Sequence, residues 1–250
     1  MRLSIVVPVH NEEEILRATT LALIDHLQSF PGSEVILVEN ASTDRSPQQV
    51  ESLAVELTTD RVAVIPGTSP KGYGSACKQG MRIATGDLIV LTAADLPFGF
   101  SDVESYQRCT HPPPMAIGSK ANRHSVVESP PTRKILSAGF RLYRRVVLGM
   151  RVGDSQGTIL MTSSTAKVLL PYLEAEDYFL STEVIAVAGW LGIEAVELPI
   201  IYANPRPESK VRPLQDGWSM LKATLRLRAR LRSLPTPSDQ SLGAAKPARR

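Results

Sequence analysis

Acidic, amide and basic side chains gather at the places where apolar runs of the chain end. The groups are His10–Glu12 after run 3–9, Glu39–Asp44 after 34–38, Lys71–Gly74 after 62–65, and Asp95 after 88–92. Side chains of these types hold polar and anionic ligands, because carboxylates accept N–H and O–H donors and lysine donates to anions. If the runs are parallel strands, all four groups face one rim of the sheet. Ligands of open α/β sheets bind at that rim.

The first hundred residues alternate strand and helix patterns. Strands are predicted at 3–9, 34–38, 62–65 and 88–92. A helix to about Ser29 is predicted to be capped by Asn11, with Glu12, Glu13 and Glu14 in its first turn. Further helices are predicted from Ser46 and over 75–84. Strands separated by helices imply right-handed crossovers and a mostly parallel sheet covered on both faces, which is an α/β fold.

The second half of the chain is less regular. Strands are predicted at 115–120, 158–162 and 193–202, and helices at 133–148 and 182–191. We expect this half to complete the sheet and to supply a second substrate pocket. The basic side chains of 133–148 form an ordinary solvated face by default. Among them, only Arg133 is favoured as a ligand.

Composition excludes several classes of protein. The chain has 250 residues, 43% of them apolar, with a formal net charge of +3. Its only cysteines are Cys77 and Cys109, which fit neither a disulfide scaffold nor a cysteine-bound zinc site. Phosphate-loop, dinucleotide-binding and GxSxG patterns are absent. No run is long and uncharged enough to span a membrane, so we expect a soluble or peripheral protein.

Charge is distributed unevenly along the chain. Residues 210–250 contain ten basic and two acidic side chains, a net charge of +8, and the first 209 residues carry −5. Within 213–233 we predict a basic amphipathic helix, with Leu214, Trp218, Leu221 and Leu225 on one face. Such a helix suits an anionic membrane surface. The alternative is that its apolar face packs on the domain. Residues 234–250 are predicted to be disordered.

The order of the motifs resembles that of family 2 glycosyltransferases of GT-A fold. The segments are VVPVHNEEEIL at 6–16, VENASTD at 38–44 and GDLIVLTAADL at 86–96. They are similar to the family's PxxNE, DDGSTDxT and GdyivxxDaDl patterns. Further segments resemble the polyprenyl-phosphate mannose and glucose synthases: Gly118–Lys120, Arg133 with Ser137, Asp154–Thr158, and Pro207–Lys210. The resemblance covers about residues 3–212.

This resemblance implies roles for individual residues. The nucleotide-sugar site would comprise Pro8, Asn11, Glu12, Glu39, Lys71 and Asp95. The acceptor phosphate would be held by Lys120, Arg133, Ser137 and Lys210. Asp95 would hold Mg²⁺ or Mn²⁺ beside the diphosphate, and Asp95, Asp154, Arg133 and Lys210 are the candidate catalytic residues. The implied domains are 1–212, with a nucleotide-sugar half at 1–95 and an acceptor half at 96–212, then the helix at 213–233 and the tail.

The sequence departs from the family pattern at three places. Glu39 and Asn40 replace paired aspartates, and Ala41 replaces the following glycine. Ala93 replaces the first Asp of the DxD motif, which leaves Asp95 to bind metal with the diphosphate. Pro207 replaces the glycine before the Ser-Lys pair, with Glu208 intervening.

The resulting prediction is an enzyme that transfers a hexose from GDP-mannose or UDP-glucose to polyprenyl phosphate with inversion. It would act as a peripheral protein on the cytoplasmic face of a membrane and bind no nucleic acid. Two alternatives stay open: a family 2 glycosyltransferase with a soluble acceptor, and a non-catalytic relative that binds nucleotide sugar.

Overall fold

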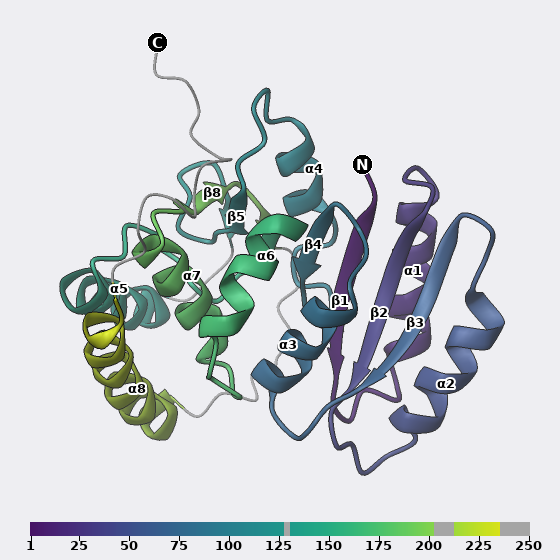
Figure 1. Ribbon diagram of the computed structural model, residues 1–250, viewed down its shortest axis with the longest axis horizontal. Coiled ribbons are helices and arrows are strands. Elements are labelled where there is room, and N and C mark those ends of the chain that lie inside the picture. The colour runs from purple at the N-terminus through teal and green to yellow at the C-terminus, as the bar shows by residue number, and fades with distance from the viewer. Residues whose placement is uncertain (128–130, 203–212, 236–250) are drawn as a thin grey trace.

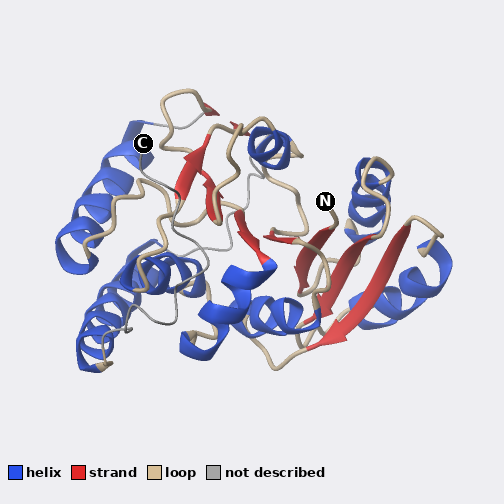
Figure 2. Ribbon diagram, turned by 45° about the horizontal axis from the view of Figure 1, so that its top comes forward, coloured by secondary structure: helices blue, strands red, loops and turns tan. Residues whose placement is uncertain are grey.

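A seven-stranded sheet forms the centre of the molecule (Figures 1 and 2). The computed structural model describes residues 1–127, 131–202 and 213–235, and within these ranges it does not describe the side chains of 131–138 and 213–218. The strand order is β3-β2-β1-β4-β7-β5-β8. The strands are β1 (Leu3–Val9), β2 (Ser33–Glu39), β3 (Val62–Thr68), β4 (Leu88–Leu91), β5 (Met115–Gly118), β7 (Ile159–Thr162) and β8 (Val196–Leu198).

Helices cover both faces of this sheet (Figure 1). The α-helices are α1 (Leu16–Leu27), α2 (Ser46–Leu57), α3 (Tyr73–Ile83), α4 (Ser101–Gln107), α5 (Pro131–Leu148), α6 (Ser163–Leu169), α7 (Leu180–Trp190) and α8 (Pro213–Ser233). Successive side chains of β1 point to opposite faces. Accordingly Val7 packs with residues of α1 and α2, and Val6 packs with residues of α3 and α7. The sheet therefore has a hydrophobic core on each face.

The first four strands in this sheet are parallel, which places the ends of β1, β2, β3 and β4 at one rim. The strand β7 runs antiparallel to both of its neighbours, β4 and β5. The fold is thus a mostly parallel α/β sheet, as predicted. One reversed strand joins its two halves.

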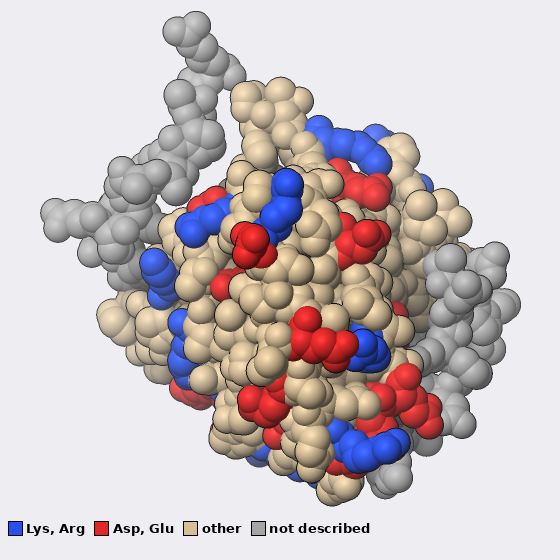
Figure 3. Space-filling model, turned by 90° about the vertical axis from the view of Figure 1, so that its right-hand side faces the viewer, with Lys and Arg blue, Asp and Glu red and all other residues tan. Residues whose placement is uncertain are grey.

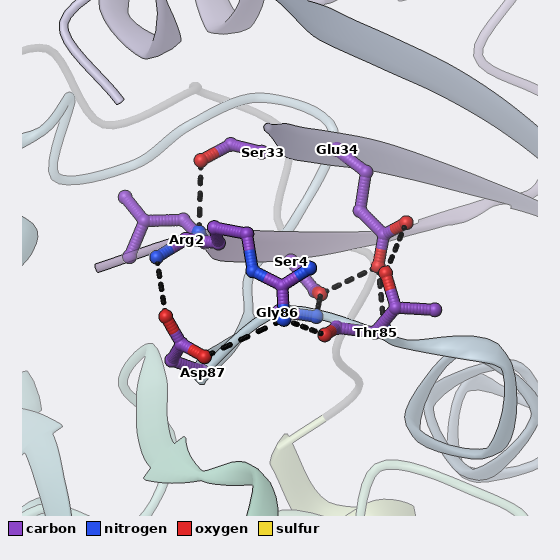
Figure 4. Close-up of polar contacts among 8 residues, drawn as sticks. Arg2, Ser4, Ser33, Glu34, Thr85, Gly86 and Asp87 are labelled. Carbon is purple, nitrogen blue, oxygen red and sulfur yellow. Dashed lines mark hydrogen bonds and ion pairs between the residues drawn. The ribbon is translucent and has the colours of Figure 1, made fainter. Parts of the chain in front are cut away.

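A buried hydrogen-bond network lies at the end of the sheet opposite to this rim, where β1 and β2 begin (Figure 4). Glu34 is 7% exposed, and its carboxylate accepts hydrogen bonds from the Ser4 hydroxyl and the Thr85 backbone N–H, each at 2.6 Å. The Ser4 hydroxyl in turn accepts from the Gly86 N–H at 2.8 Å. A buried carboxylate is tolerated when such donors replace its hydration. This network joins β1, β2 and the turn before β4.

Several boundaries differ from the prediction. The helix α1 begins at Leu16 and not after Asn11, whose backbone has a φ of 54°. The predicted strand 193–202 is two pieces, β8 and β9 (Ile201–Tyr202), and β9 pairs with β6 (Val126–Val127) in a separate two-stranded sheet. The helices α4 and α6 were not predicted from the sequence. Each has only seven residues, too few to establish a helical period in the sequence.

The helix α8 spans the residues at which a helix is predicted, 213–233. Thr224 and Leu227 are buried against the domain, and the Leu225 side chain is 54% exposed. The Tyr143 hydroxyl of α5 donates to the Leu221 carbonyl at 3.0 Å, which places α5 beside α8. Among the described residues, no helix is long and apolar enough to cross a bilayer.

Candidate active site

The turns after β1 and β2 interlock at the rim. The Asn11 side-chain oxygen accepts a hydrogen bond from the Thr43 N–H at 2.7 Å. The Asn11 N–H donates to the Ser42 hydroxyl at 3.1 Å, and the Glu12 N–H donates to the Ser46 hydroxyl at 3.0 Å. Asn11 therefore links two turns and does not cap α1. Its left-handed backbone conformation is one that asparagine tolerates better than most residues.

Carboxylates hold these turns in shape. Glu39 accepts from the Ser42 N–H at 2.5 Å, and Asp44 accepts from the N–H groups of Ser46 and Glu13. Burial works to raise the pKa of Asp44, but the hydrogen bonds, first that from the Ser46 N–H, outweigh burial and lower it. A carboxylate that accepts several N–H groups stays ionised. Glu39, predicted to contact the nucleotide, thus has one oxygen engaged within its own turn.

The glycine loop at 71–74 is held from two sides. The Gly72 N–H donates to the Asn40 side-chain oxygen at 2.6 Å, and the Gly74 N–H donates to the Glu176 carbonyl at 2.8 Å. A Cβ atom on Gly72 would lie 2.1 Å from that carbonyl oxygen, and Gly72 has a φ of 136°. Only glycine fits this position. The predicted nucleotide contact Lys71 is exposed beside it, two residues before α3.

Asp95 lies in the turn after β4, and its side chain is exposed. The Leu96 N–H closes the turn on the Ala93 carbonyl at 3.0 Å, and the Thr19 hydroxyl donates to the Ala94 carbonyl at 2.6 Å. Within the described ranges, no three His, Cys, Asp or Glu side chains come together to hold a metal ion. One exposed carboxylate fits a divalent ion that brings diphosphate oxygens and water as its other ligands.

In the second half of the chain, Lys120 and Asp154 lie side by side. The Lys120 N–H donates to the Asp154 carboxylate at 3.2 Å. The Lys120 ammonium lies 4.6 Å from the Tyr202 ring centroid and 5.6 Å from that of Phe98, a cation–π arrangement. A Cβ atom on Gly157 would lie 1.7 Å from the Gly118 carbonyl oxygen, so the loop after Asp154 packs directly on the end of β5.

Sequence reasoning missed Arg144, which was assigned to a solvated helix face. Its side chain is 4% exposed, and it donates to the Gly153 carbonyl at 3.2 Å. Burial lowers its pKa, while the charge of Asp154 opposes that change. Four residues after Phe140 on α5, Arg144 also lies 5.2 Å from that ring. The prediction was wrong because a charge pattern on one helix does not show what packs against that helix.

The remaining predicted site residues divide into two groups. Pro8 lies in β1, paired with Val38 of β2, and is half-buried next to the rim. The side chains of Arg133, Ser137 and Lys210 lie outside the described part of the structure. The structure therefore brings Pro8, Asn11, Glu12, Glu39, Lys71 and Asp95 to one rim, and brings Lys120 next to Asp154 in the other half.

Comparison with known proteins identifies the family that the first part of the chain matches. Residues 4–108, which contain β2, β3, β4 and all of β1 except Leu3, match the model of glycosyl transferase family 2. The chain carries a family 2 glycosyltransferase domain. The family recognised from the motif order and the glycosyltransferase class are confirmed.

Relatives of this glycosyltransferase cover most of the chain. A dolichyl-phosphate beta-glucosyltransferase of Saccharomyces cerevisiae is 28% identical over 79% of the chain and 66% of its own length. An undecaprenyl-phosphate mannosyltransferase of Micrococcus luteus is 27% identical over 82% of the chain and 84% of its own length. The chain thus spans just under two thirds of the yeast protein.

A solved structure shares the fold of this glycosyltransferase. Glucosyl-3-phosphoglycerate synthase from Mycobacterium tuberculosis, in complex with Mg²⁺ and UDP, superposes with a TM-score of 0.62 at 16% identity. The match covers 94% of the present chain and 81% of that one. The likeness confirms the predicted GT-A-type fold.

Proposed function

We propose that this glycosyltransferase moves a hexose from a nucleotide sugar to a polyprenyl phosphate, with inversion at the anomeric carbon. The observation that carries the proposal is the rim, where Asn11, Lys71 and Asp95 follow three different strands of one parallel sheet. Relatives named for transfer to dolichyl and undecaprenyl phosphate support the choice of acceptor.

The chemistry makes few demands on the protein. A phosphate monoester has a second pKa of about 6, so the acceptor is already ionised at pH 7 and needs no general base. One direct displacement inverts the anomeric centre. The protein must bring two anions together, which is the role proposed for Lys120, Arg133 and Lys210, with Ser137 donating a hydrogen bond. Asp154 would orient Lys120 through the hydrogen bond to its backbone.

On the donor side, Asn11, Glu12 and Glu39 would bind base and ribose, and Lys71 the diphosphate. Asp95 would hold Mg²⁺ or Mn²⁺. When bound, such an ion would neutralise charge on the departing diphosphate. The solved relative with Mg²⁺ and UDP supports a divalent ion in a site of this fold.

We also propose that the protein binds an anionic membrane surface through α5 and α8. Leu142 and Val146 of α5 are 63% and 69% exposed, and Leu225 of α8 is 54% exposed. Exposed basic side chains occur on the same two helices, and residues 139–148 and 219–233 contain no Asp or Glu. The basic residues are Arg141, Arg145, Lys222, Arg226 and Arg232. Apolar side chains among cations are typical of a surface that binds anionic lipid.

The opposite end of the molecule has a different surface. Figure 3 shows acidic and basic side chains interspersed on the face beside β3 and α2. One example is the pair of Arg17 and Glu56, whose charged groups lie 2.5 Å apart. Mixed charge of this kind has no preference for an anionic bilayer. We therefore expect a peripheral protein on the cytoplasmic face of the membrane, with α5 and α8 toward the lipid.

The decisive experiment is incubation of the purified protein with labelled GDP-mannose or UDP-glucose, polyprenyl phosphate and Mg²⁺ or Mn²⁺. Formation of a labelled polyprenyl-phosphate hexose supports the proposal and identifies the donor. Transfer only to a soluble acceptor would favour the first alternative. Nucleotide binding without any turnover would favour a non-catalytic relative.

Membrane binding has its own test, sedimentation with vesicles of phosphatidylglycerol and phosphatidylcholine. Removal of residues 213–250 would also remove the buried Leu227, so a single substitution is cleaner. Leu225→Asp should reduce sedimentation, and Leu21→Asp, on an exposed position of α1, should not. Equal sedimentation of both variants and the unmodified protein would refute the proposed surface.

A further inference from the structure

A buried ion pair joins α8 to α7. The Arg230 guanidinium lies 2.6 Å from a carboxylate oxygen of Glu183 and donates to the Tyr172 carbonyl at 3.0 Å. Glu183 is 3% exposed, and the Arg230 side chain is 20% exposed. A second carboxylate, that of Glu174, lies 2.5 Å from Arg230. One arginine of the basic helix therefore faces the domain and not the solvent.

The second oxygen of Glu183 holds the segment that precedes α7. It accepts hydrogen bonds from the backbone N–H groups of Glu174 and Ala175, at 3.0 and 2.8 Å. The buried Lys78 of α3 donates to the Glu174 carbonyl at 3.0 Å. Residues 174–176 are thereby fixed from α7, α8 and α3. A buried carboxylate satisfied in this way imposes one geometry on its donors.

The same segment forms one wall of the glycine loop. The Glu176 carbonyl accepts from the N–H groups of Gly74 and Ser75, at 2.8 and 3.3 Å, in the first turn of α3. A Cβ atom on Gly74 would lie 2.5 Å from the Ala175 carbonyl oxygen, so the two backbones are in direct contact. Displacement of 174–176 would therefore displace Gly72 and Gly74.

We propose that Glu183 and Arg230 are positioning residues for the nucleotide, because they hold segment 174–176 against the glycine loop at 71–74. This inference rests on the proposed function, in which that loop contacts the nucleotide diphosphate. Neither side chain touches the donor. They act through the segment that fixes the backbone of the loop, and the Asn40 side chain fixes the loop from the other side.

The test compares Glu183→Gln and Arg230→Gln with a matched control on α8, the helix that carries Arg230. Arg228→Gln is that control, because Arg228 donates to the Val146 carbonyl of α5 and not to segment 174–176. Binding of UDP and GDP with Mg²⁺ is measured by calorimetry in the full chain, at a temperature where each variant is folded. Amide hydrogen exchange of peptides spanning 72–78 is measured in the same samples.

We expect roughly tenfold weaker nucleotide binding in both test variants, which corresponds to a loss of about 1.4 kcal/mol in binding free energy. Exchange at 72–78 should be faster in both, and the control should match the unmodified protein. If Arg230→Gln does not fold, Arg230→Lys, which keeps the charge but offers one nitrogen, takes its place and should bind nucleotide more weakly than the unmodified protein does. Lower melting temperatures with unchanged affinity and unchanged exchange would refute the inference.

The failure of the proposed function gives a different result. If the unmodified protein binds neither nucleotide, the proposed donor site is wrong. The exchange measurement then decides by itself whether Glu183 and Arg230 hold the glycine loop. Unchanged exchange in both variants would contradict that role.

Discussion

The side-chain oxygen of Asn40 accepts a hydrogen bond from the backbone N–H of Gly72 at 2.6 Å, which ties the end of β2 to the glycine loop. Asn40 is 4% exposed, and its own backbone N–H donates to the Val9 carbonyl at the end of β1. One amide residue thus connects the carboxyl ends of two strands with the turn that begins α3. The glycine loop is positioned by the sheet as well as by segment 174–176.

Replacement of Asn40 by alanine should lower both stability and nucleotide affinity. The change leaves the half-buried Gly72 N–H without its acceptor, at a cost of about 1 kcal/mol. Chemical denaturation should show that loss, and calorimetry with UDP and GDP should show weaker binding. Asn40→Asp retains the acceptor oxygen and should keep more of the affinity than Asn40→Ala. Equal affinity in Asn40→Ala and the unmodified protein would contradict a role for this contact.

Ala41→Gly should stabilise the protein. Ala41 has a φ of 52°, a left-handed conformation that costs an L-residue roughly 1 kcal/mol and glycine almost nothing. Part of the gain is offset by the greater freedom of glycine in the unfolded chain. We expect the free energy of unfolding to rise by about 0.5 kcal/mol. The control Ala54→Gly, within α2, should lower it by about 1 kcal/mol.

Metal dependence should respond in opposite directions at two positions of the turn after β4. Asp95→Ala removes the only carboxylate of the turn, and should abolish Mn²⁺-dependent nucleotide binding and turnover. Ala93→Asp supplies a second carboxylate two residues earlier and should tighten Mn²⁺, because the ion favours carboxylate oxygens. Titration of Mn²⁺ in the presence of UDP or GDP measures both. Unchanged titrations in the two variants would remove Asp95 from the metal site.

The sequence predicts the first hundred residues of the fold well, because local signals there agree with the observed strands and helices. The β-branched run at 3–9 and the Ser46–Pro47 start of α2 each correspond to the observed element. The boundary of α1 was wrong because Asn11 bonds to Thr43, a residue 32 positions away, and not to its own helix. A capping signal read from sequence cannot show such a distant partner.

The rest of the chain was harder to predict, because its side chains are placed by contacts between residues far apart in the sequence. Arg144 and Arg230 belong to helices whose basic residues are predicted to face the solvent. In the structure, Arg144 instead contacts the Gly153 carbonyl, and Arg230 contacts the Glu183 carboxylate of α7. The buried face of α8 includes Thr224, whose hydroxyl donates to the Met220 carbonyl of its own helix. A threonine satisfied in this way packs like an apolar residue, and hydropathy alone assigns it to the surface.

Cys77 should make stability fall steeply at alkaline pH. The thiol is fully buried in α3, and this burial raises its pKa from 9.0 to about 12, although a hydrogen bond with Tyr73 opposes the change. Between these two values the unfolded chain has lost the thiol proton and the folded chain keeps it. Folding then requires uptake of a proton, so stability decreases with rising pH by up to about 1.4 kcal/mol per unit from this group.

Urea denaturation of the unmodified protein and Cys77→Ala at pH 8, 9, 10 and 11 measures this dependence. Cys77→Ala lowers stability at pH 8, because it leaves a small cavity. The stability of Cys77→Ala should nevertheless decline less steeply between pH 9 and 11, since the variant lacks a group that titrates in this range only in the unfolded chain. Burial also raises the pKa of Tyr73, so some decline should persist above pH 10. Parallel pH profiles for the two proteins would mean that the folded chain already releases the Cys77 proton near pH 9.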